Sequence, residues 1–113
     1  MRLFNRALSL GHVHEKINVK EGEYTISLVV DADVSTLAQR TKTALSMMQN
    51  AAGDRSAMEE AGFTLSRVMF GDEQTQRLLE FYAGNRVSLL EISLRIFAQR
   101  LSKKIEKAQR AQV

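Results

Sequence analysis

The chain has 113 residues, of which 44% are apolar, and this is the size and composition of one compact domain with a single core. It contains no Cys, which excludes a disulfide framework, a thiolate zinc site, an iron–sulfur cluster and a cysteine nucleophile. The net charge of +3 is uneven: residues 1–94 hold ten Lys and Arg against twelve Asp and Glu, whereas residues 95–113 hold six against one. A slightly acidic body is therefore followed by a basic end.

Residues 1–32 are predicted to be a β element. Apolar and polar residues alternate in two stretches, 15–19 and 23–30, on either side of Gly22. Because glycine tolerates the positive φ of a tight turn, we expect these stretches to pair as a β-hairpin. Arg2–Ser9 fits a further strand, which we favour, or a short helix. A two-stranded hairpin is marginal alone in water, so other elements must cover its apolar face.

Residues 33–85 are predicted to form a helical body. The apolar spacing changes to the helical period after Asp33, and the carboxylates of Asp31 and Asp33 both suit a helix N-terminus. Ser56 stands three residues before a Glu, the capping-box spacing, and is expected to open the second helix. Gly71 is expected to separate the second helix from a third, which ends at Gly84.

The final helix is predicted to start at Arg86 and to run to near Ala108. It has two apolar stripes, one formed by Val87, Leu90, Leu94, Phe97, Leu101 and Ala108 and the other by Leu89, Ile92 and Ile96. Its first half is therefore apolar on more than half of its circumference, which a peripheral helix of one domain does not need. We expect the excess apolar surface to be covered by another polypeptide, and the basic second half to extend away from the domain.

The order of elements predicts the α+β class, with residues 1–113 as a single domain. An N-terminal β-hairpin or small antiparallel sheet (1–32) precedes a helical body (33–85) and a long C-terminal helix with a basic end (86–113), giving three to four α-helices in all. Residues 1–6 are not followed by an apolar stretch of signal-peptide length, and the apolar runs are too short to cross a bilayer. We therefore expect a soluble cytoplasmic protein that does not bind membranes.

The residues that could support catalysis or metal binding have simpler interpretations. His12 and His14 would share one face of an extended segment, a spacing that metal sites use, but a third ligand is not in place. The carboxylate pairs lie at predicted helix starts, where negative charge interacts favourably with unpaired backbone N–H groups. The sequence has neither a Gly-x-Ser-x-Gly elbow nor a phosphate-binding glycine loop. We expect no enzymatic activity, no cofactor and no metal.

The basic end supports an alternative function, nucleic-acid binding. Four cations, with Arg100 before them, could contact phosphates and give a salt-sensitive affinity; they are Lys103, Lys104, Lys107 and Arg110. Aromatic residues are absent after Phe97, however, and no base-recognition motif is present. Cationic residues in a last turn also complement the helix dipole. A small nucleic-acid-binding protein therefore remains the alternative to a protein-binding one.

We expect the main partner to be a protein, and the chain itself to form a homo-oligomer. The candidate partner-binding residues are Leu89, Ile92, Ile96, Phe97 and Leu101 as the apolar contact surface, with Arg100, Lys103, Lys104 and Lys107 beside it. The several Met residues are consistent with this interpretation because Met is common on surfaces that accept a partner segment, although Met also fills ordinary cores.

Four short motifs resemble a known protein group. They are Gly22-Glu23-Tyr24-Thr25-Ile26, Phe70-Gly71-Asp72-Glu73, Leu78-Leu79-Glu80-Phe81-Tyr82 and Lys103-Lys104-Ile105-Glu106-Lys107, in that order along the chain. The chain resembles the tail assembly chaperone-like proteins of tailed bacteriophages and prophages, in which a long final helix, here ending at residues 103–107, is part of the pattern but its basic charge is not. The resemblance implies a non-enzymatic protein of the infected bacterial cytoplasm. Such a protein keeps the tape-measure protein or tail-tube subunits soluble before virion assembly.

Overall fold

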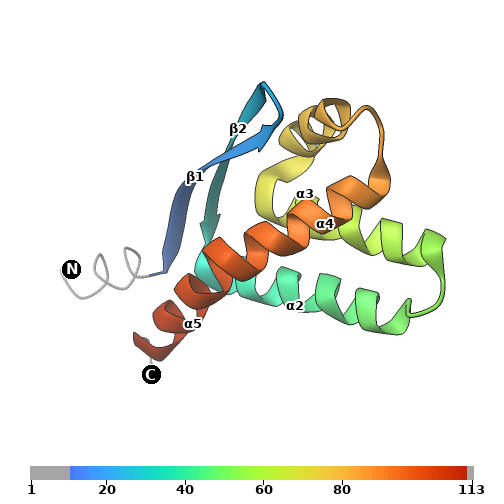
Figure 1. Ribbon diagram of the computed structural model, residues 1–113. Helices are drawn as coiled ribbons and strands as arrows, with labels where there is room; N and C mark the ends of the chain where they lie inside the picture. The colour runs from blue at the N-terminus through green and yellow to red at the C-terminus, as the bar shows by residue number, and fades with distance from the viewer. Residues whose placement is uncertain (1–10, 112–113) are drawn as a thin grey trace.

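The computed structural model describes residues 11–111, so the strand expected at Arg2–Ser9 lies outside the described residues. The elements are β1 (His12–Glu21), β2 (Tyr24–Asp33), α2 (Val34–Asn50), α3 (Arg55–Phe81), α4 (Arg86–Ile96), the π-helical turn η1 (Phe97–Leu101) and α5 (Ser102–Ala111). As Figure 1 shows, α4, η1 and α5 form one long final helix, and the helices lie to one side of the hairpin. This is the predicted α+β architecture, an antiparallel hairpin followed by three helices. Within residues 11–111, no helix is both long and apolar enough to cross a membrane.

The hairpin forms as predicted, but its strands are longer than expected. Val19 pairs with Ile26 and Ile17 with Leu28, around a turn in which Gly22 has a φ of 61°. Alternate side chains on each strand are buried, among them Val13, Ile17, Val19, Ile26, Leu28 and Val30. This face packs against the helices, α3 in particular, which supplies the cover that a two-stranded hairpin requires.

The caps of the first two helices show one confirmed and one wrong prediction. Asp33 caps α2, because its Oδ2 accepts a hydrogen bond of 3.0 Å from the backbone N–H of Thr36. Asp54, not Ser56, caps α3 and accepts a bond of 3.1 Å from the backbone N–H of Ala57. Asp54 has extended φ and ψ angles, as a cap residue must, whereas Ser56 already lies within the first turn of the helix.

The helix α3 is interrupted at Gly71, where the sequence predicts a break. Gly71 has a φ of 81° and a ψ of 173°, so the backbone changes direction there and the segment after it returns towards the hairpin. Two contacts fix this segment. The hydroxyls of Ser66 and Thr75 form a buried hydrogen bond of 2.8 Å across the break, and the Gln74 amide bonds to both backbone groups of Val29 in β2, at 2.7 and 2.8 Å.

The other glycine that determines packing is Gly62, in the middle of the first half of α3. A Cβ atom at this position would lie 2.7 Å from Leu90 Cδ1 and 3.0 Å from Leu90 Cα. Glycine at position 62 therefore lets the backbones of α3 and α4 approach closely. Glycine inside a helix ordinarily weakens the helix, and at position 62 it instead permits a close helix–helix contact.

The final helix uses both of its apolar stripes, one after the other. Leu89, Ile92 and Ile96 are buried along α4, and the next buried side chains are Leu101 and Ile105. The step from Ile96 to Leu101 is five residues, which a regular α-helix would place on different faces. In η1 the N–H of Ser102 bonds to the carbonyl of Phe97, five residues back, so one π turn returns Leu101 to the buried side.

The expectation that the second half of this helix extends away from the domain is wrong as far as Ile105. Leu101 is completely buried and Ile105 is 7% exposed. Both belong to the core of the domain, because α5 packs on α2. The reason is the π turn, which keeps the apolar side of α5 aligned with that of α4.

Candidate functional site

Most of the apolar surface that we expect to contact a partner is the core of the chain itself. Leu89 and Leu101 are completely buried, and Ile96 and Ile92 are 4% and 8% exposed. The assignment of these four side chains to a free contact surface is therefore wrong. The helices α2 and α3 cover the buried side of the final helix, which the sequence pattern alone does not reveal. Phe97 differs from the other four because it is only partly buried.

Phe97 lies at the edge of a groove that faces solvent. The groove has a volume of about 540 Å³ and is lined by Ala38, Thr41, Lys42, Leu45, Ser46, Gln49 and Phe97. Its apolar part comes from Leu45 and Phe97, and Lys42 is the charged residue of its wall. We call these seven residues the α2–Phe97 groove. It combines an apolar surface with one positive charge and no carboxylate.

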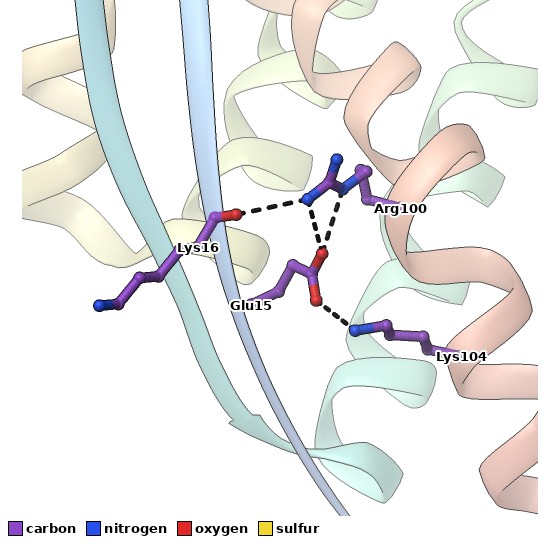
Figure 2. A network of polar contacts seen from close by, with 4 residues as sticks. All are labelled: Glu15, Lys16, Arg100 and Lys104. Atoms are coloured by element: carbon purple, nitrogen blue, oxygen red, sulfur yellow. Dashed lines mark hydrogen bonds and ion pairs between the residues drawn. The ribbon is translucent and has the colours of Figure 1, made fainter.

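Two of the four expected partner-binding cations are bound within the chain, as Figure 2 shows. The guanidinium of Arg100 donates two hydrogen bonds, of 2.8 and 3.1 Å, to Oε1 of Glu15. The ammonium of Lys104 pairs with the other oxygen, Oε2. Arg100 also reaches the backbone carbonyl of Lys16 at 3.4 Å. These contacts tie β1 to the final helix just beside the π turn.

The Glu15 carboxylate is the centre of this network, and the sequence does not reveal it because its partners are more than 80 residues away. The Glu15 side chain is 14% exposed, whereas those of Arg100 and Lys104 are about half exposed. The hydrogen bond from Lys104 lowers the pKa of Glu15 below its usual value of 4.5, and Arg100 lowers it further against the opposing effect of desolvation.

Replacing Glu15 by Gln is expected to reduce stability at neutral pH and to have little effect in acid. A lowered folded-state pKa stabilises the fold above the pKa of the unfolded chain, and this contribution is lost as pH falls through the folded-state pKa. Because both cations are half exposed, we expect a loss of only about 1 kcal/mol at pH 7. Urea unfolding of both proteins between pH 7 and pH 3 measures the difference. If the difference in unfolding free energy between the two proteins does not shrink below pH 4.5, the Glu15 carboxylate is not the source of this stability.

The outer side of α5 carries the remaining cations. Lys103, Lys107 and Arg110 are all exposed, and their spacing of four and then three residues places them on one face of the helix. Arg110 also forms an ion pair with Glu106. We call Lys103, Lys107 and Arg110 the basic face. It is turned away from the buried side chains of Leu101 and Ile105.

His12 and His14 lie on the same exposed face of β1, as predicted. Both point at Asp31 on β2: His12 Nε2 contacts Oδ1, and His14 Nδ1 lies 3.7 Å from Oδ2. The hydrogen bond from His12 lowers the pKa of Asp31. No group of three or more His, Asp, Glu or Cys side chains in the described chain is arranged to hold a metal ion. The strand register explains the pairing, because His14 is directly opposite Asp31.

The tip of the hairpin is a further exposed feature of the molecule. Tyr24 is 75% exposed, and among the large hydrophobic side chains of residues 11–111 it alone is exposed and not buried or partly buried. It pairs across the turn with Glu21, and Glu23 precedes it. We call Glu21, Glu23 and Tyr24 the hairpin tip. It presents an exposed aromatic ring, with one Glu opposite it on β1 and another next to it in sequence.

Known proteins provide no assignment for this arrangement. No family model matches the chain, and neither a curated protein nor a solved structure shows significant similarity to it.

Proposed function

We propose that this chain is a non-enzymatic protein that binds an acidic partner protein through the basic face of α5. In its specific form, the partner is a tape-measure or tail-tube protein, kept soluble in the cytoplasm of a bacterial host during virion assembly. The specific form depends on the resemblance to tail assembly chaperones. It is supported by the order of elements, a hairpin, a helical body broken at Gly71 and a long final helix, which is the order that the resemblance implies.

The observation that carries the proposal is the separation of the cations into two groups. Arg100 and Lys104 are directed at Glu15 and hold the hairpin in place. Lys103 and Lys107 are directed to solvent, and Arg110, which pairs with Glu106 on the same helix, continues their row, so that the three cations span two turns of helix, a length of about 10 Å. A row of this length matches carboxylates that are spaced in the same way on a partner helix.

Nucleic-acid binding is the second candidate, because the same face could contact phosphates. The two functions differ in their salt dependence and in their ligand. A face that neutralises three phosphates gives an affinity for nucleic acid that falls steeply with salt, with a slope of about −3 in a double-logarithmic plot. The described structure places no aromatic side chain on the basic face for base stacking, which favours the protein partner.

Reversing the charges of the basic face is expected to weaken partner binding at least tenfold and to leave the fold intact. The variant carries Lys103→Glu, Lys107→Glu and Arg110→Glu, and the control carries Lys16→Glu, Lys20→Glu and Arg77→Glu. All six positions are exposed, so neither variant disturbs the core. Each variant replaces three cations by three carboxylates, so both change the net charge equally. The assay is co-expression with the tape-measure protein of the genome that encodes the chain, followed by measurement of its soluble fraction and of copurification. We expect the wild type and the control to keep the tape-measure protein soluble, and the basic-face variant to bind the tape-measure protein at least tenfold more weakly.

Two outcomes would contradict the proposal. If wild type leaves the tape-measure and tail-tube proteins insoluble, or if the genome encodes no tail proteins, the chaperone function is wrong. The wild type could instead bind a duplex DNA or single-stranded RNA oligonucleotide at 50 mM salt and release it by 300 mM. If the basic-face variant then fails to bind the same oligonucleotide, nucleic-acid binding replaces protein binding.

A further inference from the structure

The hairpin tip and the α2–Phe97 groove have complementary chemistry. The tip offers an exposed aromatic ring, that of Tyr24, beside the carboxylates of Glu21 and Glu23. The groove offers an apolar surface with the ammonium of Lys42 in its wall. Its volume of about 540 Å³ has room for one aromatic side chain. Tyrosine is well suited to such a contact, since its ring is rigid and largely apolar while its hydroxyl remains hydrated.

Charge distribution around the groove strengthens this match. The helix α2, which supplies six of the seven lining residues, contains Arg40 and Lys42 and no Asp or Glu. The end of the hairpin, residues 20–24, by contrast, holds two carboxylates, those of Glu21 and Glu23, against the one cation Lys20. An acidic tip is therefore attracted to the α2 surface, and two tips or two grooves are not attracted to each other.

The tip and the groove of one molecule cannot meet. In Figure 1 the turn between β1 and β2 lies beside the end of α3, whereas α2 crosses the opposite part of the molecule. The strands are paired along their whole length, from His12–Asp33 to Glu21–Tyr24, and this holds the tip away from α2. A contact between the two features thus requires two molecules.

We propose that the hairpin tip of one copy of this chain docks in the α2–Phe97 groove of a second copy. The contact joins different surfaces of the two molecules, so each bound copy leaves a free tip at one end and a free groove at the other. Such head-to-tail contacts close into a ring or continue as a filament. The assembly repeats the basic face of α5 in every copy. The inference goes beyond the proposed function and does not depend on the identity of the partner of that face.

The proposal is tested with two variants that each remove one side of the contact. Tyr24→Ser removes the ring from the tip and leaves the groove intact. Lys42→Glu with Ser46→Glu makes the groove wall acidic and leaves the tip intact. All three positions are exposed, so both proteins are expected to fold, and circular dichroism checks this. Sedimentation velocity from 10 μM to 1 mM in 50 mM salt measures association, because one side chain in one groove gives a weak contact.

The wild type is expected to increase in mass with concentration, and each variant to remain monomeric, with association weakened at least tenfold. An equimolar mixture of the two variants is expected to form a complex of two molecules and no larger species, because one intact tip and one intact groove remain. Three results would overturn the proposal. They are a wild type that stays monomeric at 1 mM, variants that associate like the wild type, and a mixture that stays monomeric. None of them bears on the basic face, so failure here leaves the proposed function standing.

Discussion

Replacement of Leu101 by Ala is expected to lower the free energy of unfolding by about 3 kcal/mol. Leu101 is completely buried and lies in the core with Ile96 and Ile105. Truncating such a side chain removes its transfer free energy and leaves a cavity, which together cost between about 2 and 5 kcal/mol. This is a large fraction of the total stability of a domain of this size. Urea unfolding followed by circular dichroism measures the change.

The matched control is Lys103→Ala, two residues further along the same helix. The Lys103 side chain is exposed, so the control is expected to change stability by less than about 0.5 kcal/mol. The two variants distinguish two roles that the sequence pattern allows for the final helix, that of a core element and that of a partner-binding surface. If Leu101→Ala cost less than 1 kcal/mol and weakened association of the protein instead, Leu101 would belong to an interface and the core assignment would be wrong.

The fold is predictable from the sequence because its signals are local. Alternation on both sides of Gly22 specifies the hairpin, and the period change after Asp33 specifies the start of the helices. Gly71 breaks α3 because no other residue adopts its backbone angles easily. Each of these signals depends on residues only a few positions apart. Such residues determine the local backbone structure whatever the rest of the chain does, so the sequence alone is enough to predict it.

The candidate site is less predictable because it depends on which surfaces remain after folding. A stripe such as Leu89 and Ile92 shows that a helix face must be covered, but not whether the same chain or a partner covers it. The role of Arg100 depends on Glu15, which lies 85 residues earlier in the sequence. The exposed ring of Tyr24 belongs to an alternating strand pattern that predicts burial for one face. Predicting such features requires knowledge of the strand register and of the packing of the whole chain.

Two single-residue deletions in the final helix are expected to have very different effects. Deleting Gln99 shortens the step from Ile96 to Leu101 from five residues to four, so a regular α-helix then places both on the same face. The π turn is no longer required, and stability is expected to change by about 1 kcal/mol or less. Deleting Glu91 removes a residue from a regular α-helix and rotates Ile92 and Ile96 by about 100° relative to Leu89.

The Glu91 deletion is expected to cost about 4 kcal/mol or more, because two buried Ile side chains leave the core. Both deleted residues are exposed, so the contrast reports the geometry of the helix and not the loss of a side chain. Thermal and urea unfolding compare the two proteins, and amide chemical shifts of residues 96–102 report whether the π turn has become α-helical. Equal and large losses from both deletions would show that the π turn itself, with its positioning of Arg100 on Glu15, is required for the fold. A small loss for the Gln99 deletion alone would mean that the five-residue step is not required for the stability of the fold.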